Sequence, residues 1–285
     1  MLSKLFVSSR PLSWVNTAFP FAAAYFLSGG DLVTLVVGTL YFLIPYNLAM
    51  YGINDVFDYE SDLRNPRKGG VEGAVLDRSM HRPTLIAVAV TNIPFVVYLV
   101  AVGSPLSWLV LAISLFAVVA YSAKGLRFKE IPFVDSLTSS THFVSPAVYG
   151  LVLAGATFTP QLVALLGAFF LWGVASHAFG AVQDVIADRE GGLASVATVI
   201  GARATVRLSV VAYLLAGALL LFTSWPGPLA ALLALPYAVS CAQFWNVTDA
   251  DSETANRGWK RFLWLNFVTG FLVTMLMIWF AWLTR

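Results

Sequence analysis

The chain carries very little charge and almost no cysteine. Only 11% of its 285 residues are charged, against about 25% in an average soluble domain. The single cysteine, Cys241, lies in an apolar run, which excludes an internal disulfide and a metal site built on several thiolates. The formal net charge of +2 indicates no more than a preference for membrane surfaces, and we expect no nucleic-acid partner.

Apolar residues make up 59% of the chain, and the mean hydropathy is +0.78. Runs of about 20 apolar residues, the length that crosses a bilayer, recur along the whole sequence. We predict nine membrane-spanning helices, at residues 12–28, 32–53, 83–102, 106–122, 137–154, 162–182, 205–223, 228–245 and 262–283. Helices satisfy their own backbone groups in lipid, and these runs lack the alternation of barrel strands. We therefore expect an all-α polytopic membrane protein, with about nine helices around a central cavity and one domain over residues 1–285.

The charged residues predict the orientation in the membrane. Lys4 and Arg10 precede the first apolar run as in a signal peptide, but that run is long and has no clear cleavage site, so we expect it to be retained. With nine spans, the N-terminus and the loops that hold almost all the charge share one side: 54–82, 122–136, 183–204 and 246–261. Sixteen of the seventeen Lys and Arg fall there once Arg207 is included. The positive-inside rule makes this side cytoplasmic, and we expect the plasma membrane.

Two acidic motifs follow apolar runs on that side. Asn54 to Asp62 reads N-D-x-x-D-x-x-x-D, and Asp184 to Asp188 reads D-x-x-x-D. On a helix each set of carboxylates would line one face. Such carboxylates repel one another unless a cation lies between them, and oxygen ligands without nearby His or Cys fit Mg²⁺ shared with substrate phosphates. The metal ligands that we predict are Asp55, Asp58, Asp62, Asp184 and Asp188.

The paired motifs resemble those of the UbiA superfamily of intramembrane prenyltransferases. Three smaller motifs support this resemblance: Arg10-Pro11-x-x-Trp14, Tyr121-Ser122-x-Lys124 and Gly192-Leu193-x-Ser195-Val196-Ala197. The resemblance covers essentially the whole chain. It implies Mg²⁺-dependent transfer of a prenyl group from its diphosphate, with Asp55, Asp58, Asp184 and Asp188 as the catalytic residues.

A narrower resemblance concerns the acceptor. Residues 46–76, 138–142 and 244–250 are similar to the actinobacterial lycopene elongases of fifty-carbon carotenoid synthesis. This implies dimethylallyl diphosphate as donor, lycopene as acceptor, and a carotenoid cyclase or another pathway enzyme as a partner. Whether the terminal cation loses a proton or captures water stays open. The aromatic-acceptor branch usually carries an Arg-Pro pair soon after its first motif. Arg64-Asn65-Pro66-Arg67-Lys68-Gly69-Gly70 takes that place here, which argues against a quinone precursor as acceptor.

Other residues are candidates for contact with the diphosphate or the allylic cation. Charge-assisted hydrogen bonds bind phosphate oxygens that a metal leaves exposed, and for this we predict Asn54, Arg67, Lys68, Lys124 and Arg127. Aromatic faces stabilise a carbocation through cation–π attraction, and Tyr51 and Tyr46 precede the first motif by one and two turns. His142 and His177 could assist deprotonation, or could be hydrogen-bonded structural residues.

Two other functions stay open. A UbiA-type enzyme with a quinone precursor, a heme or a chlorophyll as acceptor would need a polar anchor deep in the cavity, and we identify none in the sequence. A cation transporter would place ionisable groups near the bilayer midplane with access from both sides. The acids of this chain lie instead at one interface.

Overall fold

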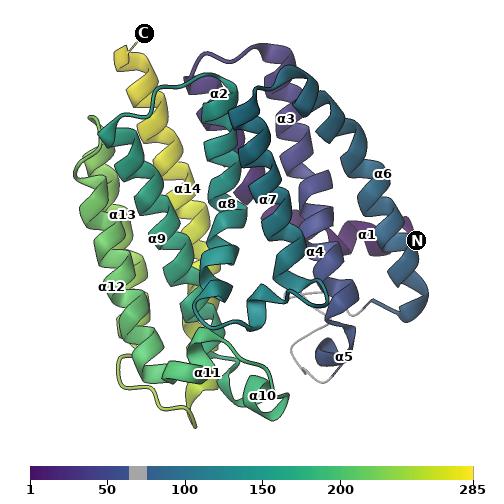
Figure 1. Cartoon of the computed structure of the whole chain (residues 1–285). Coiled ribbons are helices and arrows are strands. Elements are labelled where there is room, and N and C mark those ends of the chain that lie inside the picture. The colour runs from purple at the N-terminus through teal and green to yellow at the C-terminus, as the bar shows by residue number, and fades with distance from the viewer. Residues whose placement is uncertain (64–75, 285) are drawn as a thin grey trace. The chain divides into compact units, whose positions relative to one another are not determined.

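The computed structural model describes residues 1–63 and 76–284, apart from the side chains of Ser61 and Asp62 (Figure 1). Every regular element in the described part is a helix, which confirms the predicted all-α class. The chain divides into two compact units. Unit 1 comprises Met1–Phe128 and Thr141–Ala156, and unit 2 comprises Lys129–Ser140 and Thr157–Arg285. The single domain and the central cavity stay predictions.

Unit 1 is built around helix α4, which packs against α1, α3, α6 and α7. Its helices are α1 (Leu2–Ser8), α2 (Trp14–Leu27), α3 (Leu32–Leu43), α4 (Pro45–Phe57), α5 (Tyr59–Asp62), α6 (Arg78–Val102), α7 (Pro105–Ser122) and the second part of α8 (Val134–Leu153). Proline begins α4 and α7, where its missing N–H costs no helical hydrogen bond. The core is aromatic: the Phe21 ring packs against the rings of Tyr25, Phe42 and Tyr149, all nearly inaccessible to solvent.

Unit 2 is built around helix α12, which packs against α9 and α13. Its helices are α9 (Pro160–Val182), α10 (Val185–Glu190), α11 (Val196–Ile200), α12 (Ala202–Leu220), α13 (Ala231–Ala242) and α14 (Asn256–Thr284), together with the first part of α8. Small buried residues such as Ala175, Ala212 and Ala216 lie in this core. Small side chains let helix backbones approach closely where lipid supplies no hydrophobic driving force between helices.

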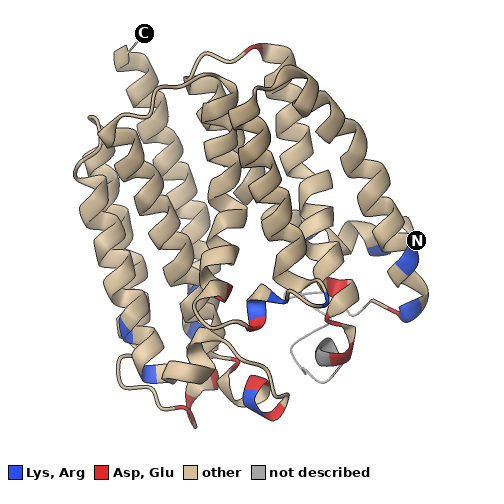
Figure 2. Ribbon diagram, in the orientation of Figure 1, with Lys and Arg blue, Asp and Glu red and all other residues tan. Residues whose placement is uncertain are grey.

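Six segments of the described chain are long and apolar enough to span a membrane: Leu32–Phe57, Arg78–Val102, Pro105–Ser122, Pro160–Val182, Ala202–Leu220 and Ser252–Thr284. The other three predicted spans correspond to helices α2, α8 and α13. These helices are not among the six segments, so the number of nine spans stays a prediction. Large apolar side chains cover the surface of α14, with Trp264 75% and Trp282 78% exposed. Within each unit most charged residues gather at one end of the helices (Figure 2), and Asp31, the N-cap of α3, is an exception. Apolar faces with charged ends are typical of an integral membrane protein.

The close approach of α8 to α2 gives a test of the unit 1 core. A Cβ on Gly150 would lie 2.9 Å from the Phe21 carbonyl oxygen and 3.2 Å from the Tyr25 nitrogen, and these backbone atoms cannot move aside cheaply. We expect Gly150→Ala to destabilise the protein by about 1–3 kcal/mol through overpacking. Gly270→Ala is the matched control, because a Cβ on Gly270 in α14 meets nothing within 4 Å. Thermal unfolding in detergent checks both, and equal stability of the two variants would contradict the close packing.

Candidate functional site

The first acidic motif lies where a membrane helix ends, and not on one continuous helix. Helix α4 ends at Phe57, Asp58 is its C-cap, and Asp62 falls in the separate helix α5. The expectation that Asp55, Asp58 and Asp62 share one helix face is therefore wrong for the third residue. The backbone turns after Asp58, so the 3.6-residue period stops there. The side chain of Asp62 lies outside the described residues, as do Arg67 and Lys68.

Asp55 is buried, at 1% exposure, and the N-terminal segment supplies its hydrogen-bond donors. Ser8 Oγ donates to Oδ2 at 2.8 Å, and Arg10 Nη2 donates to Oδ1 at 2.5 Å. The Arg10 guanidinium also lies over the Tyr51 ring, 4.8 Å from its centroid. Arg10 has a left-handed backbone (φ 52°), which a non-glycine residue adopts at some cost in energy. These contacts attach residues 8–10 to the first motif, and sequence reasoning missed them.

Asp58 is held by two of the residues predicted to bind diphosphate. Asn54 Nδ2 donates to Asp58 Oδ2 at 2.6 Å and to Ser122 Oγ at 2.8 Å, which connects the end of α4 to the end of α7. Arg127 Nη2 lies 3.7 Å from Asp58 Oδ1. The structure thus brings Asn54, Asp58 and Arg127 together. Lys124 is exposed in the turn that follows α7, and it makes no hydrogen bond or ion pair with the described side chains of the motif.

The two candidate tyrosines differ in their surroundings. Tyr46 is fully buried, its hydroxyl lies 3.0 Å from Ser114 Oγ, and its ring packs against Tyr41 and Phe42. These contacts account for Tyr46 as a packing residue. Tyr51 is half-buried and already faces the Arg10 cation, so its ring lies beside the carboxylates of the motif. A role for either ring toward an allylic cation stays a prediction.

The second acidic motif also lies at a helix break. Helix α9 ends at Val182, and Asp184 is the N-cap of the six-residue helix α10, which contains Asp188. The break has a local cause, because the Gln183 side chain donates to the Gly180 carbonyl in the last turn of α9 at 3.0 Å. Asp184 and Asp188 are four residues apart as predicted, with the Asp188 N–H donating to the Asp184 carbonyl at 2.8 Å. Both side chains are half-buried.

A buried carboxylate that the sequence did not single out lies in the same unit. Asp135 is fully buried and accepts hydrogen bonds from the backbone N–H groups of Ser136 (2.7 Å) and Val196 (2.8 Å). The second bond caps the first turn of α11, where the helix dipole favours negative charge. Ser136 Oγ lies 3.1 Å from Nδ1 of His177. This contact is what a hydrogen-bonded structural histidine makes. His142, in unit 1, packs edge-to-face on Tyr121.

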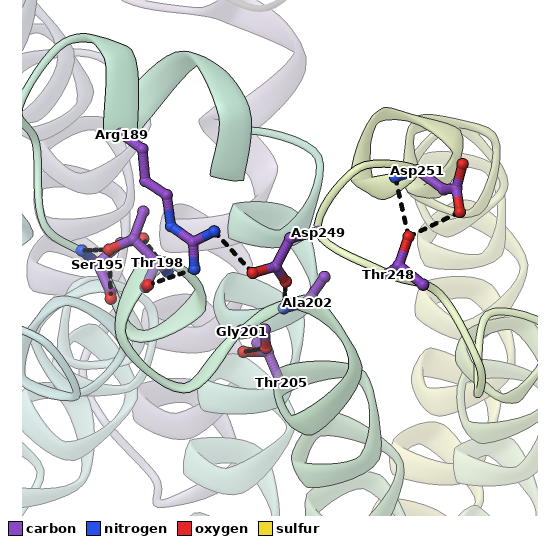
Figure 3. A network of polar contacts seen from close by, with 9 residues as sticks. All are labelled: Arg189, Ser195, Thr198, Gly201, Ala202, Thr205, Thr248, Asp249 and Asp251. Carbon is purple, nitrogen blue, oxygen red and sulfur yellow. Dashed lines mark hydrogen bonds and ion pairs between the residues drawn. The ribbon is translucent and has the colours of Figure 1, made fainter.

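A polar network follows the second motif in the chain (Figure 3). Arg189, the residue after Asp188, donates from Nη1 to Asp249 Oδ2 at 2.6 Å and from Nη2 to the Thr198 carbonyl at 2.8 Å. Asp249 Oδ1 accepts from the Ala202 N–H at the start of α12, at 2.7 Å. This N–H and the Arg189 guanidinium hold the pKa of the Asp249 carboxyl below its usual range. The Arg189 guanidinium therefore binds Asp249 and the Thr198 carbonyl within the protein.

The donor groups of the two motifs fit Mg²⁺ by their chemistry. They are carboxylate and amide oxygens, which hard cations prefer. Among the described residues no three His, Cys, Asp or Glu side chains gather as a ready metal cage. Mg²⁺ commonly uses only one or two carboxylates and takes its other ligands from substrate phosphates and water. The arrangement within each motif fits that mode of binding.

Comparison with known proteins shows the family of the chain. Residues 17–266 match the UbiA prenyltransferase family. The chain is 63% identical over 282 residues to the C(50) beta-cyclic carotenoids biosynthesis protein LbtBC of Dietzia sp. (strain CQ4), a match that covers 98% of this chain but only 65% of the relative. It is 57% identical over 275 residues to a lycopene elongase/hydratase of Corynebacterium glutamicum, covering 96% of each chain.

The fold is similar to a solved structure of a UbiA homolog from Archaeoglobus fulgidus bound to DMAPP and Mg²⁺. That match has a TM-score of 0.68 at 19% identity and covers 93% of this chain and 98% of the other. The family match spans most of the sequence, including both acidic motifs and helices of both units. The chain therefore belongs to the UbiA prenyltransferase family and is an integral membrane prenyltransferase.

Proposed function

We propose that the protein transfers dimethylallyl groups from dimethylallyl diphosphate to the ends of lycopene, in a Mg²⁺-dependent reaction that leads to fifty-carbon carotenoids. The observation that carries this proposal is the 57% identity, over 96% of both chains, to a lycopene elongase/hydratase. The donor and the metal are supported by the A. fulgidus homolog bound to DMAPP and Mg²⁺.

The reaction begins at the allylic C–O bond of the donor. This bond breaks, and its electron pair leaves with the diphosphate. The terminal double bond of lycopene attacks the five-carbon cation, which forms a C–C bond and leaves a tertiary cation on lycopene. Loss of a proton, or capture of water followed by loss of a proton, gives the product. Repetition at the other end adds ten carbons in total.

The chain's own residues bind and orient the diphosphate. We assign Asp55, Asp58 and Asp62 of the first motif, and Asp184 and Asp188 of the second, as Mg²⁺ ligands. Bound Mg²⁺ supplies a Lewis acid that neutralises the departing diphosphate. Asn54 keeps the Asp58 carboxylate in place through its 2.6 Å hydrogen bond.

Positive side chains complete the binding of the diphosphate in this proposal. Arg10 and Arg127 already lie against Asp55 and Asp58, so their guanidinium groups are within reach of a phosphate that binds at those carboxylates. Lys124 follows α7 and adds a charge from the same turn as Arg127. Arg67 and Lys68 stay candidates by their place after the first motif. Tyr51 is the ring that we assign to the allylic cation, because it neighbours Asp55 in α4.

The location and the partner of the enzyme are also part of the proposal. We place the protein in the plasma membrane with both motifs on the cytoplasmic side, because Lys and Arg concentrate in the segments that carry them. A carotenoid cyclase or another pathway enzyme is the expected partner. The Dietzia relative is named for beta-cyclic carotenoids, and the match covers only 65% of its length.

Removal of a metal ligand should abolish transfer without preventing insertion into the membrane. We expect Asp58→Ala and Asp184→Ala each to lower the turnover rate by about 100- to 1,000-fold, as the loss of a group that stabilises charge in the transition state does. Chelation should stop the wild-type reaction, and added Mg²⁺ should restore it. The control is Glu60→Gln, since Glu60 is exposed and pairs with Arg78. An Asp58→Ala protein that keeps most of its activity would contradict the metal assignment.

The acceptor can be identified by pigment analysis. A lycopene-producing host that expresses the chain should accumulate carotenoids heavier by one and two five-carbon units, detected by mass spectrometry. An additional mass of water would show that the terminal cation captures water and does not lose a proton. Unchanged lycopene, together with prenylation of an aromatic acceptor by the purified protein, would refute the carotenoid assignment and leave the prenyltransferase one.

Sidedness can be measured with single cysteines in a Cys241→Ser background. Lys124→Cys and Glu190→Cys should react with an impermeant thiol reagent only from the cytoplasmic side, because both residues are exposed, Lys124 in the turn after α7 and Glu190 at the end of α10. Thr157→Cys, exposed between α8 and α9, should react only from outside. Labelling of positions 124 and 157 from the same side would show that the proposed orientation is wrong.

A further inference from the structure

Asp249 lies in the segment between α13 and α14, far in sequence from the acidic motifs. Its carboxylate nevertheless joins two other elements of unit 2, as Figure 3 shows. One oxygen accepts from Arg189 on α10 at 2.6 Å, and the other accepts from the Ala202 N–H that begins α12 at 2.7 Å. Asp249 therefore connects the short helix of the second motif to the start of a membrane-spanning helix.

Arg189 extends the connection to a third element. Its Nη2 donates to the Thr198 carbonyl of α11 at 2.8 Å. Helix α11 is itself fixed by a capping box, in which Ser195 and Thr198 exchange side chain to backbone hydrogen bonds. The single guanidinium thus holds α10 to α11 and, through Asp249, to α12.

Helix α10 needs such support from outside. It has six residues, Val185–Glu190, whereas isolated helices shorter than about 12 residues are marginal in water. Val185 is its one fully buried side chain, so apolar packing fixes the beginning of the helix much better than its end. The polar contacts of Arg189 therefore help to fix the second half of the helix, which contains Asp188.

The charge of Arg189 has a second consequence. A guanidinium adjacent to Asp188 could pair with the carboxylates of the motif and compete there with a metal ion. The Arg189 guanidinium binds the Asp249 carboxylate instead, and this contact occupies its Nη1. The pair is 44% and 40% exposed in its side chains, and exposed ion pairs contribute little to stability. Its main effect is thus on geometry.

We propose that Asp249 is a positioning residue for the second acidic motif: acting through Arg189, it sets the orientation of α10 and so presents Asp184 and Asp188 to the Mg²⁺-bound diphosphate. This inference rests on the proposed function and assigns a role to a residue outside both motifs. Asp249 acts on the donor half of the reaction, so the recognition of the apolar acceptor should not depend on it.

The test replaces the charge and keeps the shape. Asp249→Asn retains an oxygen for the Ala202 N–H but removes the anion that faces Arg189. We expect the Mg²⁺ concentration for half-maximal activity to rise by about 10-fold, as with other residues that orient metal ligands. The KM for lycopene should stay unchanged. Hydrogen exchange of residues 185–190 should become faster, which reports the release of α10 without any assay of activity.

Two further variants separate positioning from general damage. Asp251→Asn is the matched control, since Asp251 lies two residues away and its side chain accepts a local hydrogen bond from Thr248 Oγ1. It should leave both the Mg²⁺ requirement and the exchange unchanged. Arg189→Gln leaves the Asp249 bond to α12 intact and should reproduce the effects of Asp249→Asn, even if the latter folds poorly. Arg189→Lys, which keeps the charge but not the paired donors, should fall between wild type and Arg189→Gln.

The outcomes distinguish this inference from the proposed function. Unchanged exchange of α10 and an unchanged Mg²⁺ requirement in both Asp249→Asn and Arg189→Gln would overturn the positioning role. An equal loss of donor and acceptor use, with faster exchange throughout unit 2, would also overturn it, because that is the result of general destabilisation. If the wild-type protein shows no Mg²⁺-dependent transfer, the proposed function fails, while faster exchange confined to residues 185–190 would still support the contact that fixes α10.

Discussion

A carboxylate near the end of a membrane helix cannot remain without a positive charge or hydrogen-bond donors, because burial removes the water that would otherwise stabilise its charge. The local structure around the acids follows from this constraint. Asp55 recruits Ser8 and Arg10 from the N-terminal segment, and Asp58 is held by Asn54 and approached by Arg127. In unit 2, Asp135 receives two backbone N–H groups. Chain segments that are distant in the sequence are therefore brought together around the acids.

The same constraint explains why the motifs lie at helix ends. An ionised carboxylate within the hydrocarbon region costs several kcal/mol, so the acids lie at the ends of the apolar runs and not within them. Ending α4 at Phe57 and α9 at Val182 leaves each motif at a break in the helix. The backbone changes direction at each break. Acids on either side of a break can therefore point toward the same bound ion.

Much of the architecture could be predicted from the sequence. Apolar runs predicted the positions of the helices, because lipid forces each run to satisfy its own backbone groups. The acidic spacing identified the motifs and the family. The helix breaks were missed because side chain to backbone bonds such as that of Gln183 to Gly180 leave no periodic signal. Asp135 was missed because one isolated acid in a loop looks like a solvated residue until the backbone that it caps is known.

Contacts between distant segments were the other gap. Arg10 stood out in a motif, yet nothing in the sequence around it identifies Asp55 as its partner, and the same holds for Arg189 and Asp249. Partners of this kind depend on how helices pack, which a single sequence does not specify. Conversely, Tyr46 was predicted to stabilise the allylic cation because of its place before Tyr51. The structure shows it fully buried in the core, with its hydroxyl bonded to Ser114.

The bond between Arg10 and Asp55 has a consequence for biosynthesis. Asp55 is made 45 residues after Arg10, and in between the chain forms α2 and then the apolar segment Leu32–Phe57. The two residues meet because α2 and α3 pack against each other. A nascent chain therefore cannot complete the surroundings of Asp55 before its first two long helices have paired.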